Sequence, residues 1–446
     1  MSEPNRPPSP AAQGSPTRRA VLHQAGLVGL TGAGAGLLAG CGASGAATDL
    51  GGDQPVLRIG YVSPITGAAA GSGDVDNFVL QKFTAALGSG LAVGGTTYRV
   101  QLELRDSEST PAHATQVAKE LIASGVDLML AHSTPETVNQ VANACEAARV
   151  PCLTTVCPWE AYYFGRGATP GKPFTYTYHF YFGNAQSSAL FKSLWLSGLP
   201  NNHRVGVLWP DDADGAAVRK SLGPELSKAG VTIVDPGAFP DGTQDFSPII
   251  ASFIRQRVDL LTSVALPPDF ARFWRQATEQ GFRPKIATIA KTALLPSQVE
   301  ALGDPGLGLT TGVRWHPSWP TSSNLLGLTS QQLADVYEQQ TRQQWTMDLG
   351  SAVALVETAI HALSASGAPK DRKAVAKALS TTVLDTVVGR LDWTRGPVKN
   401  VAIEPLIGGQ WVRATQGRFA LDIRIVDNSG FPAVKIQAKD SQLAPL

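Results

Sequence analysis

Hydroxyl side chains stand beside two neighbouring apolar segments, where they could bind a carboxylate or an amide. Ser133 and Thr134 follow the apolar segment Val126–Ala131, and Thr154 and Thr155 lie in the next such segment. Serine and threonine hydroxyls, together with unpaired backbone N–H groups at a helix start, can hold groups of this kind. The alternative is that they only cap helices. We favour binding over capping for the first pair and leave both interpretations open for the second.

Charged side chains stand at comparable positions in the second half of the chain. Asp211, Asp212 and Asp214 follow the apolar segment 204–209, and Lys291 follows the segment 285–289. Ligands of open parallel sheets bind at the carboxyl ends of the strands, so we take Asp214 and Lys291 as candidate ligand contacts. The three aspartates could also suggest a metal site, but the pattern supplies no fourth ligand. We interpret them as solvated turn residues and expect no bound metal.

Three tryptophans lie in predicted loops and not in helical stripes. A rigid aromatic ring in a cleft offers a stacking face and apolar area to a ligand. Trp159 comes shortly after the second hydroxyl pair, and we therefore predict that it contacts the ligand. For Trp315 and Trp319, packing between loops is an equal alternative.

Motifs for covalent chemistry are missing from the sequence. It contains no Gly-x-Ser-x-Gly, His-Glu-x-x-His or Gly-x-x-x-x-Gly-Lys-Ser/Thr pattern. His132 is the one histidine in a predicted cleft, and with no acidic partner in view it is interpreted as structural. We therefore expect a protein that is not an enzyme and that needs no cofactor.

The N-terminal residues 1–40 have the pattern of an export signal. Arg18 and Arg19 precede a weakly apolar, glycine-rich run that leads directly to Cys41. The run is too short and too weakly apolar for a stable membrane span. This order predicts a twin-arginine-type lipoprotein signal peptide, cleavage before Cys41 and a lipid anchor to a membrane outside the cytoplasm. Residues 41–55, rich in glycine and alanine, are expected to form a flexible tether.

Composition restricts the partners and the cross-links. Charge is nearly balanced, with 37 basic and 36 acidic residues and no basic stripe, so nucleic acid is not an expected partner. With Cys41 assigned to lipid, Cys145, Cys152 and Cys157 remain, and at most one disulfide can form. A bridge is permitted outside the cytoplasm, and the sequence leaves open which pair would form it.

Strand and helix patterns alternate along the chain in two successive runs. Near-continuous apolar strands are typical of parallel sheets that are buried on both faces. Two such runs predict an α/β fold with two doubly wound parallel-sheet lobes. The expected elements are 56–62, 98–105, 111–124, 126–131, 137–148 and 151–156, then 204–209, 216–229, 232–235, 246–257, 259–264, 269–280 and 285–289. A long apolar helix is expected over 349–365, and closing strands over 386–393 and 410–412.

Several short motifs between residues 57 and 411 share a particular order and spacing. They are Ile59–Gly67, Asp106–Pro111, Gln244–Ile250 and Val388–Trp393, followed by Gly409–Trp411. None is specific alone. Together they resemble the leucine/isoleucine/valine-binding family of extracytoplasmic solute-binding proteins, which feed ABC importers.

This resemblance implies a type I periplasmic-binding fold, with two lobes joined by a three-strand hinge. Lobe 1 is expected over 56–181 and 312–398, lobe 2 over 182–311 and 399–446, and the hinge near 180–183, 309–312 and 397–402. The implied function is capture of an amino acid, amide or organic acid by lobe closure, and delivery by a monomer to the permease and ATPase subunits of an ABC importer. The alternative is a sensory lipoprotein that reports its ligand to a signalling partner.

The resemblance also implies roles for particular residues. The two hydroxyl-bearing loops are expected to bind the carboxylate end of the ligand. Amino-acid binders of the family carry an acidic residue, which grips the ammonium of the ligand, where this chain has Lys291. This departure predicts an organic acid, a neutral amide or an aromatic ligand, with Lys291 on a second polar group and Trp159 over an apolar part. Asp214 could instead bind an ammonium from the opposite lobe.

Overall fold

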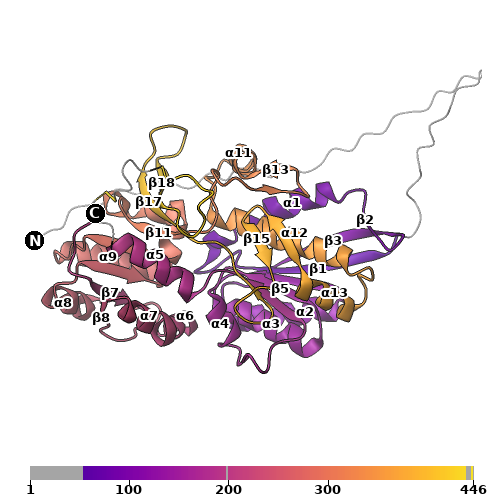
Figure 1. The fold of residues 1–446 in the computed structure, drawn as a ribbon, viewed down its shortest axis with the longest axis horizontal. Helices are drawn as coiled ribbons and strands as arrows, with labels where there is room; N and C mark the ends of the chain where they lie inside the picture. The colour runs from indigo at the N-terminus through magenta and orange to yellow at the C-terminus, as the bar shows by residue number, and fades with distance from the viewer. Residues whose placement is uncertain (1–53, 197–198, 438–442, 445) are drawn as a thin grey trace, which may run out of the picture. The chain divides into compact units, whose positions relative to one another are not determined.

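Two seven-stranded sheets form the framework of the chain (Figure 1). The computed structural model describes residues 54–196, 199–437, 443–444 and 446. The predicted signal peptide, Cys41 and nearly all of the predicted tether therefore lie outside the described residues. Among the described residues, no helix combines the length and the apolar character that a membrane span requires.

The first sheet has the strand order β16-β6-β5-β4-β1-β3-β2, and every neighbouring pair is parallel except β2–β3. Its strands are β1 (Val56–Ser63), β2 (Leu91–Val93), β3 (Thr96–Asp106), β4 (Leu128–His132), β5 (Cys152–Thr155), β6 (Thr177–Phe180) and β16 (Val401–Ala402). β4 and β5 are buried along their whole length, as expected for central strands covered on both faces.

The second sheet has the order β18-β17-β11-β10-β9-β7-β8, with antiparallel pairing of β17 to β11 and to β18. Its strands are β7 (Arg204–Leu208), β8 (Thr232–Val234), β9 (Leu260–Ser263), β10 (Ile286–Ile289), β11 (Thr310–Val313), β17 (Ile407–Arg413) and β18 (Leu421–Asp427). The predicted α/β class with two parallel-sheet lobes is confirmed, and each sheet adds antiparallel strands at one edge.

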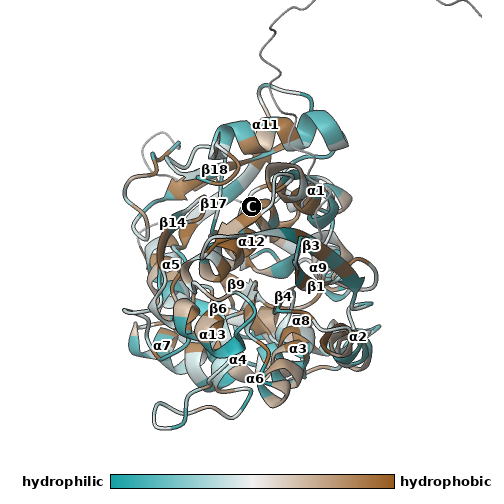
Figure 2. Ribbon diagram, turned by 90° about the vertical axis from the view of Figure 1, so that its right-hand side faces the viewer, coloured by the Kyte–Doolittle hydropathy of each residue, from teal (hydrophilic) through white to brown (hydrophobic). Residues whose placement is uncertain are grey.

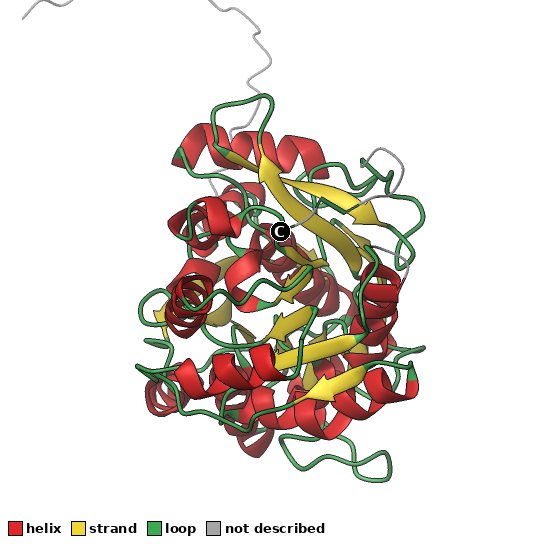
Figure 3. Ribbon diagram, turned by 90° about the vertical axis from the view of Figure 1, so that its left-hand side faces the viewer, coloured by secondary structure: helices red, strands yellow, loops and turns green. Residues whose placement is uncertain are grey.

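Helices cover the sheets, as Figure 3 shows for the side of the second sheet. They are α1 (Asp76–Ala86), α2 (Pro111–Ala123), α3 (Pro135–Ala148), α4 (Trp159–Tyr163), α5 (Asn184–Leu196), α6 (Ala213–Ala217), α7 (Gly223–Lys228), α8 (Ser247–Arg255), α9 (Pro267–Glu279), α10 (Pro296–Ala301), α11 (Ser330–Thr341), α12 (Met347–Ala365) and α13 (Arg372–Thr381). Short 3-10 turns are η1 (Ala70–Ser72), η3 (Lys291–Leu294) and η4 (Asp304–Gly306). Proline at the first turn begins several helices, including α2, α3 and α9, because its fixed φ suits that position.

The predicted helix 216–229 is not a single α-helix. A π-helical turn, η2 (Val218–Leu222), separates α6 from α7. The predicted apolar helix is confirmed as α12, which is buried on nearly all sides and is largely brown in Figure 2. A helix that is apolar all round belongs inside a core.

The predicted closing strand over 386–393 is confirmed only for residues 389–392. A two-residue turn divides this segment, so that β14 (Val383–Thr386) and β15 (Gly389–Asp392) form a separate hairpin. Gly389 follows the turn with a φ of 103°, a value that glycine adopts without steric cost. A second small hairpin joins β12 (Ser322–Ser323) to β13 (Leu328–Thr329).

The chain passes from one sheet to the other after β6, between β11 and β16, and after β16. β11 remains in the second sheet through Val313, and β16 pairs with β6 in the first sheet. The lobe boundaries given above stay predictions.

The three cysteines in the described residues form no disulfide. Cys145, Cys152 and Cys157 are buried free thiols. Cys145 and Cys152 pack in the apolar cluster between the first sheet and α2 and α3. The thiols therefore serve as small apolar side chains in this core.

Candidate functional site

One cavity is lined by residues that follow strands of both sheets, and it holds about 1120 Å³ of space including its part open to solvent. Ser133 and Thr134, which follow β4, line it from the first sheet. Asp214, in α6 after β7, and Lys291, after β10, line it from the second sheet. The structure thus brings together four of the predicted site residues at the carboxyl ends of parallel strands.

Lys291 is not an unpaired cation. Its Nζ atom lies 3.1 Å from Asp214 Oδ2 and 3.6 Å from Asp212 Oδ2. No acidic residue stands beside Lys291 in the sequence, which predicts an uncompensated charge. This prediction is wrong, because the partners come from the loop after β7 and are distant in sequence. Asp214 follows β7 and Lys291 follows β10, and both strands belong to the second sheet. The two residues therefore do not face each other from opposite sheets. Asp214 is also buried, so the interpretation of it as a solvated turn residue is wrong.

Burial governs the protonation of this ion pair. Burial raises the pKa of Asp214 to about 6; the Lys291 charge works against this rise, and the Asp212 and Glu136 charges add to it. For Lys291, burial favours the neutral form, but Asp214, Asp212 and Glu136 outweigh it and raise the pKa. Lys291 therefore stays charged, while Asp214 titrates just below neutral pH.

Glu136 is a functional candidate that sequence reasoning missed. It lies in the first turn of α3, next to the cavity residue Pro135, and its charge acts on both Asp214 and Lys291. The first turn of a helix favours an acidic residue, which is a sufficient reason for a glutamate there. No local signal in the sequence points from α3 to the loop after β7.

Several buried polar atoms at the cavity have no hydrogen-bond partner among the described residues. Ser133 Oγ, Asp214 Oδ1, Lys291 Nζ and Trp209 Nε1 belong to lining residues, and Glu136 Oε1 lies next to the lining residue Pro135. A buried polar group without a partner costs about 1–3 kcal/mol, so native structures normally pair such groups. A ligand that carries both donors and acceptors can satisfy the hydroxyl, the carboxylate oxygen and the two N–H donors of these lining residues.

Thr134 and the second hydroxyl pair have different surroundings. Thr134 is the N-cap residue of α3, but its side chain makes no capping hydrogen bond. Thr154 Oγ1 lies 2.8 Å from His179 Nδ1, and Thr155 Oγ1 donates to the carbonyl of Phe180 at 2.7 Å. Neither Thr154 nor Thr155 lines the cavity, because both side chains tie β5 to β6.

The loop after β5 reaches the cavity through other residues. Val156, Cys157 and Pro158 line it, and Val156 has a φ of 69°. Trp159 does not line it and is half-buried against Phe164, with ring centroids 5.6 Å apart.

The remaining candidates from the sequence are core residues. Trp315 and Trp319 are 0% and 3% exposed, which fits the packing alternative. His132 Nε2 lies 2.7 Å from Asp76 Oδ2, and Tyr61 donates to the other oxygen of Asp76 at 2.8 Å. Burial lowers the pKa of His132, but Asp76 outweighs it and the pKa is raised. The acidic partner of His132 therefore exists in α1, and the pair is fully buried.

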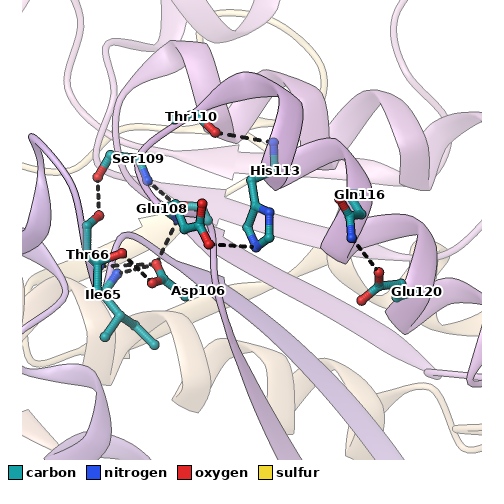
Figure 4. A network of polar contacts seen from close by, with 10 residues as sticks. Ile65, Thr66, Asp106, Glu108, Ser109, Thr110, His113, Gln116 and Glu120 are labelled. Carbon is teal, nitrogen blue, oxygen red and sulfur yellow. Dashed lines mark hydrogen bonds and ion pairs between the residues drawn. The ribbon is translucent and has the colours of Figure 1, made fainter.

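Hydrogen bonds to Asp106 hold the loop after β1 (Figure 4). Ala69 and Ser72 of this loop line the cavity. Asp106, at the end of β3, accepts from the backbone N–H of Ile65 at 3.0 Å and from the Thr66 hydroxyl at 2.6 Å. These contacts join two strand ends and fix the wall of the cavity on the side of the first sheet.

Comparison with known proteins agrees with this geometry. Residues 56–416 match a family model described as periplasmic binding protein. A Leu/Ile/Val-binding protein homolog from Brucella abortus is 25% identical over 85 residues, which span 19% of this chain and 21% of that relative. The alignment thus covers about a fifth of the curated relative.

Solved structures share the fold. A leucine binding protein, LivK, from Thermotoga maritima has a TM-score of 0.67 at 19% identity, over 82% of this chain and 97% of that one. A solute binding protein of an ABC transporter from Rhodopseudomonas palustris BisB5, in complex with 3,4-dihydroxybenzoic acid, has a TM-score of 0.66 at 16% identity, over 83% and 98%. Together with the family match, they confirm the resemblance that the sequence motifs predict.

Proposed function

We propose that this chain, which belongs to the periplasmic binding protein family, is an extracytoplasmic solute-binding lipoprotein that delivers a small organic ligand to the permease and ATPase subunits of an ABC importer. The observation that carries this proposal is the cavity at the strand ends of both sheets, with unpartnered buried polar atoms beside it. A cavity built from two sheets can bind by closure of one lobe toward the other and needs no covalent step.

The charges around the cavity favour a ligand with an ammonium group as well as a carboxylate. Asp214, Asp212 and Glu136 all act on the single Lys291, so the cluster carries more negative than positive charge. An ammonium can donate to the unpartnered oxygen of Asp214, which lines the cavity. A carboxylate fits the Ser133 hydroxyl and the start of α3. We therefore favour an α-amino acid over the organic acid that an unpaired lysine would have favoured.

Titration calorimetry with the purified full chain tests this proposal. We expect leucine and phenylalanine to bind at least tenfold more tightly than their deaminated acids, 4-methylvalerate and 3-phenylpropionate, because only the amino acids supply the ammonium. Equal or tighter binding of the acids would overturn the zwitterion assignment. Failure of all amino acids, amides and organic acids to bind at millimolar concentration would overturn the solute-binding function.

The lipid anchor on Cys41 is supported by the sequence pattern alone. Replacing Cys41→Ser should move the protein from the membrane fraction to the soluble fraction and abolish labelling with a radioactive fatty acid. Cys145→Ser is the matched control and should leave both unchanged. Membrane retention with continued labelling of the Cys41 variant would refute the anchor.

A further inference from the structure

We infer that the binding cavity continues into a second, apolar subsite inside the second lobe, which takes an elongated apolar group of the ligand. This inference rests on the proposed solute-binding function and adds a subsite to it. The cavity is lined not only by residues after the strand ends but also by Leu190 and Phe191 of α5 and by Leu222 of η2. These side chains lie in or against the apolar cluster that also contains Val207 of β7 and Leu226 of α7.

The opposite wall of this subsite is the face of the second sheet. Thr262 in β9 and Thr288 in β10 are direct neighbours in register, and both line the cavity. Trp195 of α5 donates from Nε1 to Thr288 Oγ1 at 2.8 Å, so Thr288 points toward the α5 side of the sheet. The cavity therefore enters the layer between the sheet and α5.

Gly312 shows how close the cavity comes to the middle of the sheet. It lies in β11, between two neighbouring strands, and is nevertheless partly exposed where it lines the cavity. A Cβ atom at this position would lie 2.7 Å from Leu406 Cδ1, another lining side chain. The absence of a side chain at residue 312 therefore lets Leu406 pack directly against the strand, beside the cavity.

The helical layer above the sheet departs from regular geometry at the same place. The π turn Val218–Leu222 lines the cavity with its first and last residues. A π turn widens the helix locally, and such turns occur often at functional sites. Here the wider turn lies directly over the apolar part of the cavity.

The wall chemistry selects an apolar group. Phe182, Phe191, Val264 and Leu266 line the cavity and are only half-buried, although they belong to the interior of the fold. Apolar surface exposed to water in a concave site favours binding of an apolar ligand group. Each methylene buried there is expected to strengthen binding about fourfold, which corresponds to about 0.8 kcal/mol.

A homologous series of ligands tests the subsite in the full chain. The probes are 2-aminobutyrate, norvaline, norleucine, 2-aminoheptanoate and 2-aminooctanoate, each titrated by calorimetry. We expect affinity to rise about fourfold per added methylene beyond norleucine. In Val264→Phe, which places a larger ring in the subsite, the ratio of the 2-aminooctanoate affinity to the 2-aminobutyrate affinity should fall at least tenfold.

Val412→Phe is the matched control. Val412 is a partly exposed valine in β17 of the same sheet and does not line the cavity. This variant should keep the wild-type ratio of the 2-aminooctanoate affinity to the 2-aminobutyrate affinity. Binding of the short probes with an affinity that stays flat or falls with chain length overturns the subsite and leaves the solute-binding function intact. Failure of every probe, together with failure of the panel of amino acids, amides and organic acids above, overturns both.

Discussion

Two carboxylates near the strand ends of the two sheets use their oxygens in opposite ways. Asp106, in the first sheet, accepts from the backbone N–H groups of Ile65, Thr66 and Glu108 and from the Thr66 hydroxyl (Figure 4). Asp214, beside the second sheet, pairs one oxygen with Lys291, and its other oxygen is buried without a hydrogen-bond partner in the described part of the chain. The first carboxylate is saturated by its own loops, and the second keeps bonding capacity for a ligand.

The pKa shifts of the two groups follow this difference. For Asp106, partial burial raises the pKa, but the hydrogen bonds from Thr66, Glu108 and Ile65 outweigh it, and the net shift is downward. For Asp214, burial dominates and raises the pKa to about 6. Saturation by donors marks a structural carboxylate, whereas burial with incomplete pairing marks a carboxylate that is held for binding.

The largest expected effect is on stability and comes from removing Lys291. Lys291→Met leaves Asp214 and Asp212 buried without their cation, which should lower the free energy of unfolding by about 3 kcal/mol at pH 7.5. The loss should shrink at pH 5, where Asp214, whose pKa is about 6, takes up a proton. Urea denaturation at pH 7.5 and at pH 5 measures the two losses of unfolding free energy.

Lys285→Met is the matched control for that variant. Lys285 pairs with Asp259 at 3.0 Å, but its side chain is 50% exposed. Solvent-exposed ion pairs contribute less than about 1 kcal/mol to the free energy of unfolding. Equal losses in the two lysine variants would show that the Lys291 cluster does not act as a buried ion pair.

The next effect is on affinity and concerns Ser133. Ser133→Ala removes a buried hydroxyl that has no hydrogen-bond partner among the described residues, so stability should change by less than about 0.5 kcal/mol. Loss of a hydrogen bond to a charged ligand group should weaken leucine binding by about 2 kcal/mol. Thr154→Val is the contrasting variant, because Thr154 bonds to His179 and does not line the cavity. It should lower the melting temperature and leave affinity unchanged; the reverse pattern would move the binding site to the second hydroxyl pair.

The third effect is a pH dependence of binding. Because the pKa of Asp214 is about 6, its carboxylate is mostly protonated at pH 5 and cannot attract an ammonium. The affinity for leucine should fall about tenfold between pH 7.5 and pH 5. Asp214→Asn should bind leucine weakly and with little pH dependence over this range. A wild-type affinity that is constant from pH 7.5 to pH 5 would contradict the assigned role.

Local patterns explain how much of the fold the sequence could predict. Buried central strands such as β4 are continuous apolar runs, and α2 begins at Pro111, as predicted. The starts of α3 and α9 were predicted two residues late, because the prediction did not include Pro135 and Pro267 as their first residues. α5 was not predicted, because polar residues such as Asn184 and Ser187 are buried in it and interrupt the apolar stripe. The strand β6 and the edge strand β18 also escaped prediction.

The candidate site was predictable to the extent that it follows from strand ends. Ser133 and Lys291 could be located in this way, because parallel strands end at a common edge. The residues that interact with Lys291 could not be located in this way. Asp214 meets Lys291 through the order of β7, β9 and β10 in the sheet, and Glu136 approaches both from a helix on the first sheet. Such pairings depend on tertiary arrangement, which local residue patterns do not encode.

The smallest expected effect returns to Asp106 and separates the two carboxylates most sharply. Asp106→Asn keeps one acceptor oxygen but presents an amide N–H to a loop made of donors, so stability should fall by about 1 kcal/mol at pH 7.5. Because hydrogen bonding lowers the pKa of Asp106, its stabilising contribution is present above the ordinary carboxyl pKa and is lost on acidification, and the variant and wild type should converge below pH 3. Leucine affinity should change less than threefold.

Asp214→Asn should show the opposite pattern. The raised pKa of Asp214 means that ionisation costs the folded state free energy as pH rises from about 4 to 6, so removing the charge should not lower stability by more than about 0.5 kcal/mol, while affinity falls. Parallel urea denaturation and calorimetry on the two asparagine variants make the comparison. If Asp106→Asn lost affinity and Asp214→Asn lost only stability, the ligand would lie on the loop after β1 and the cluster at Lys291 would be structural.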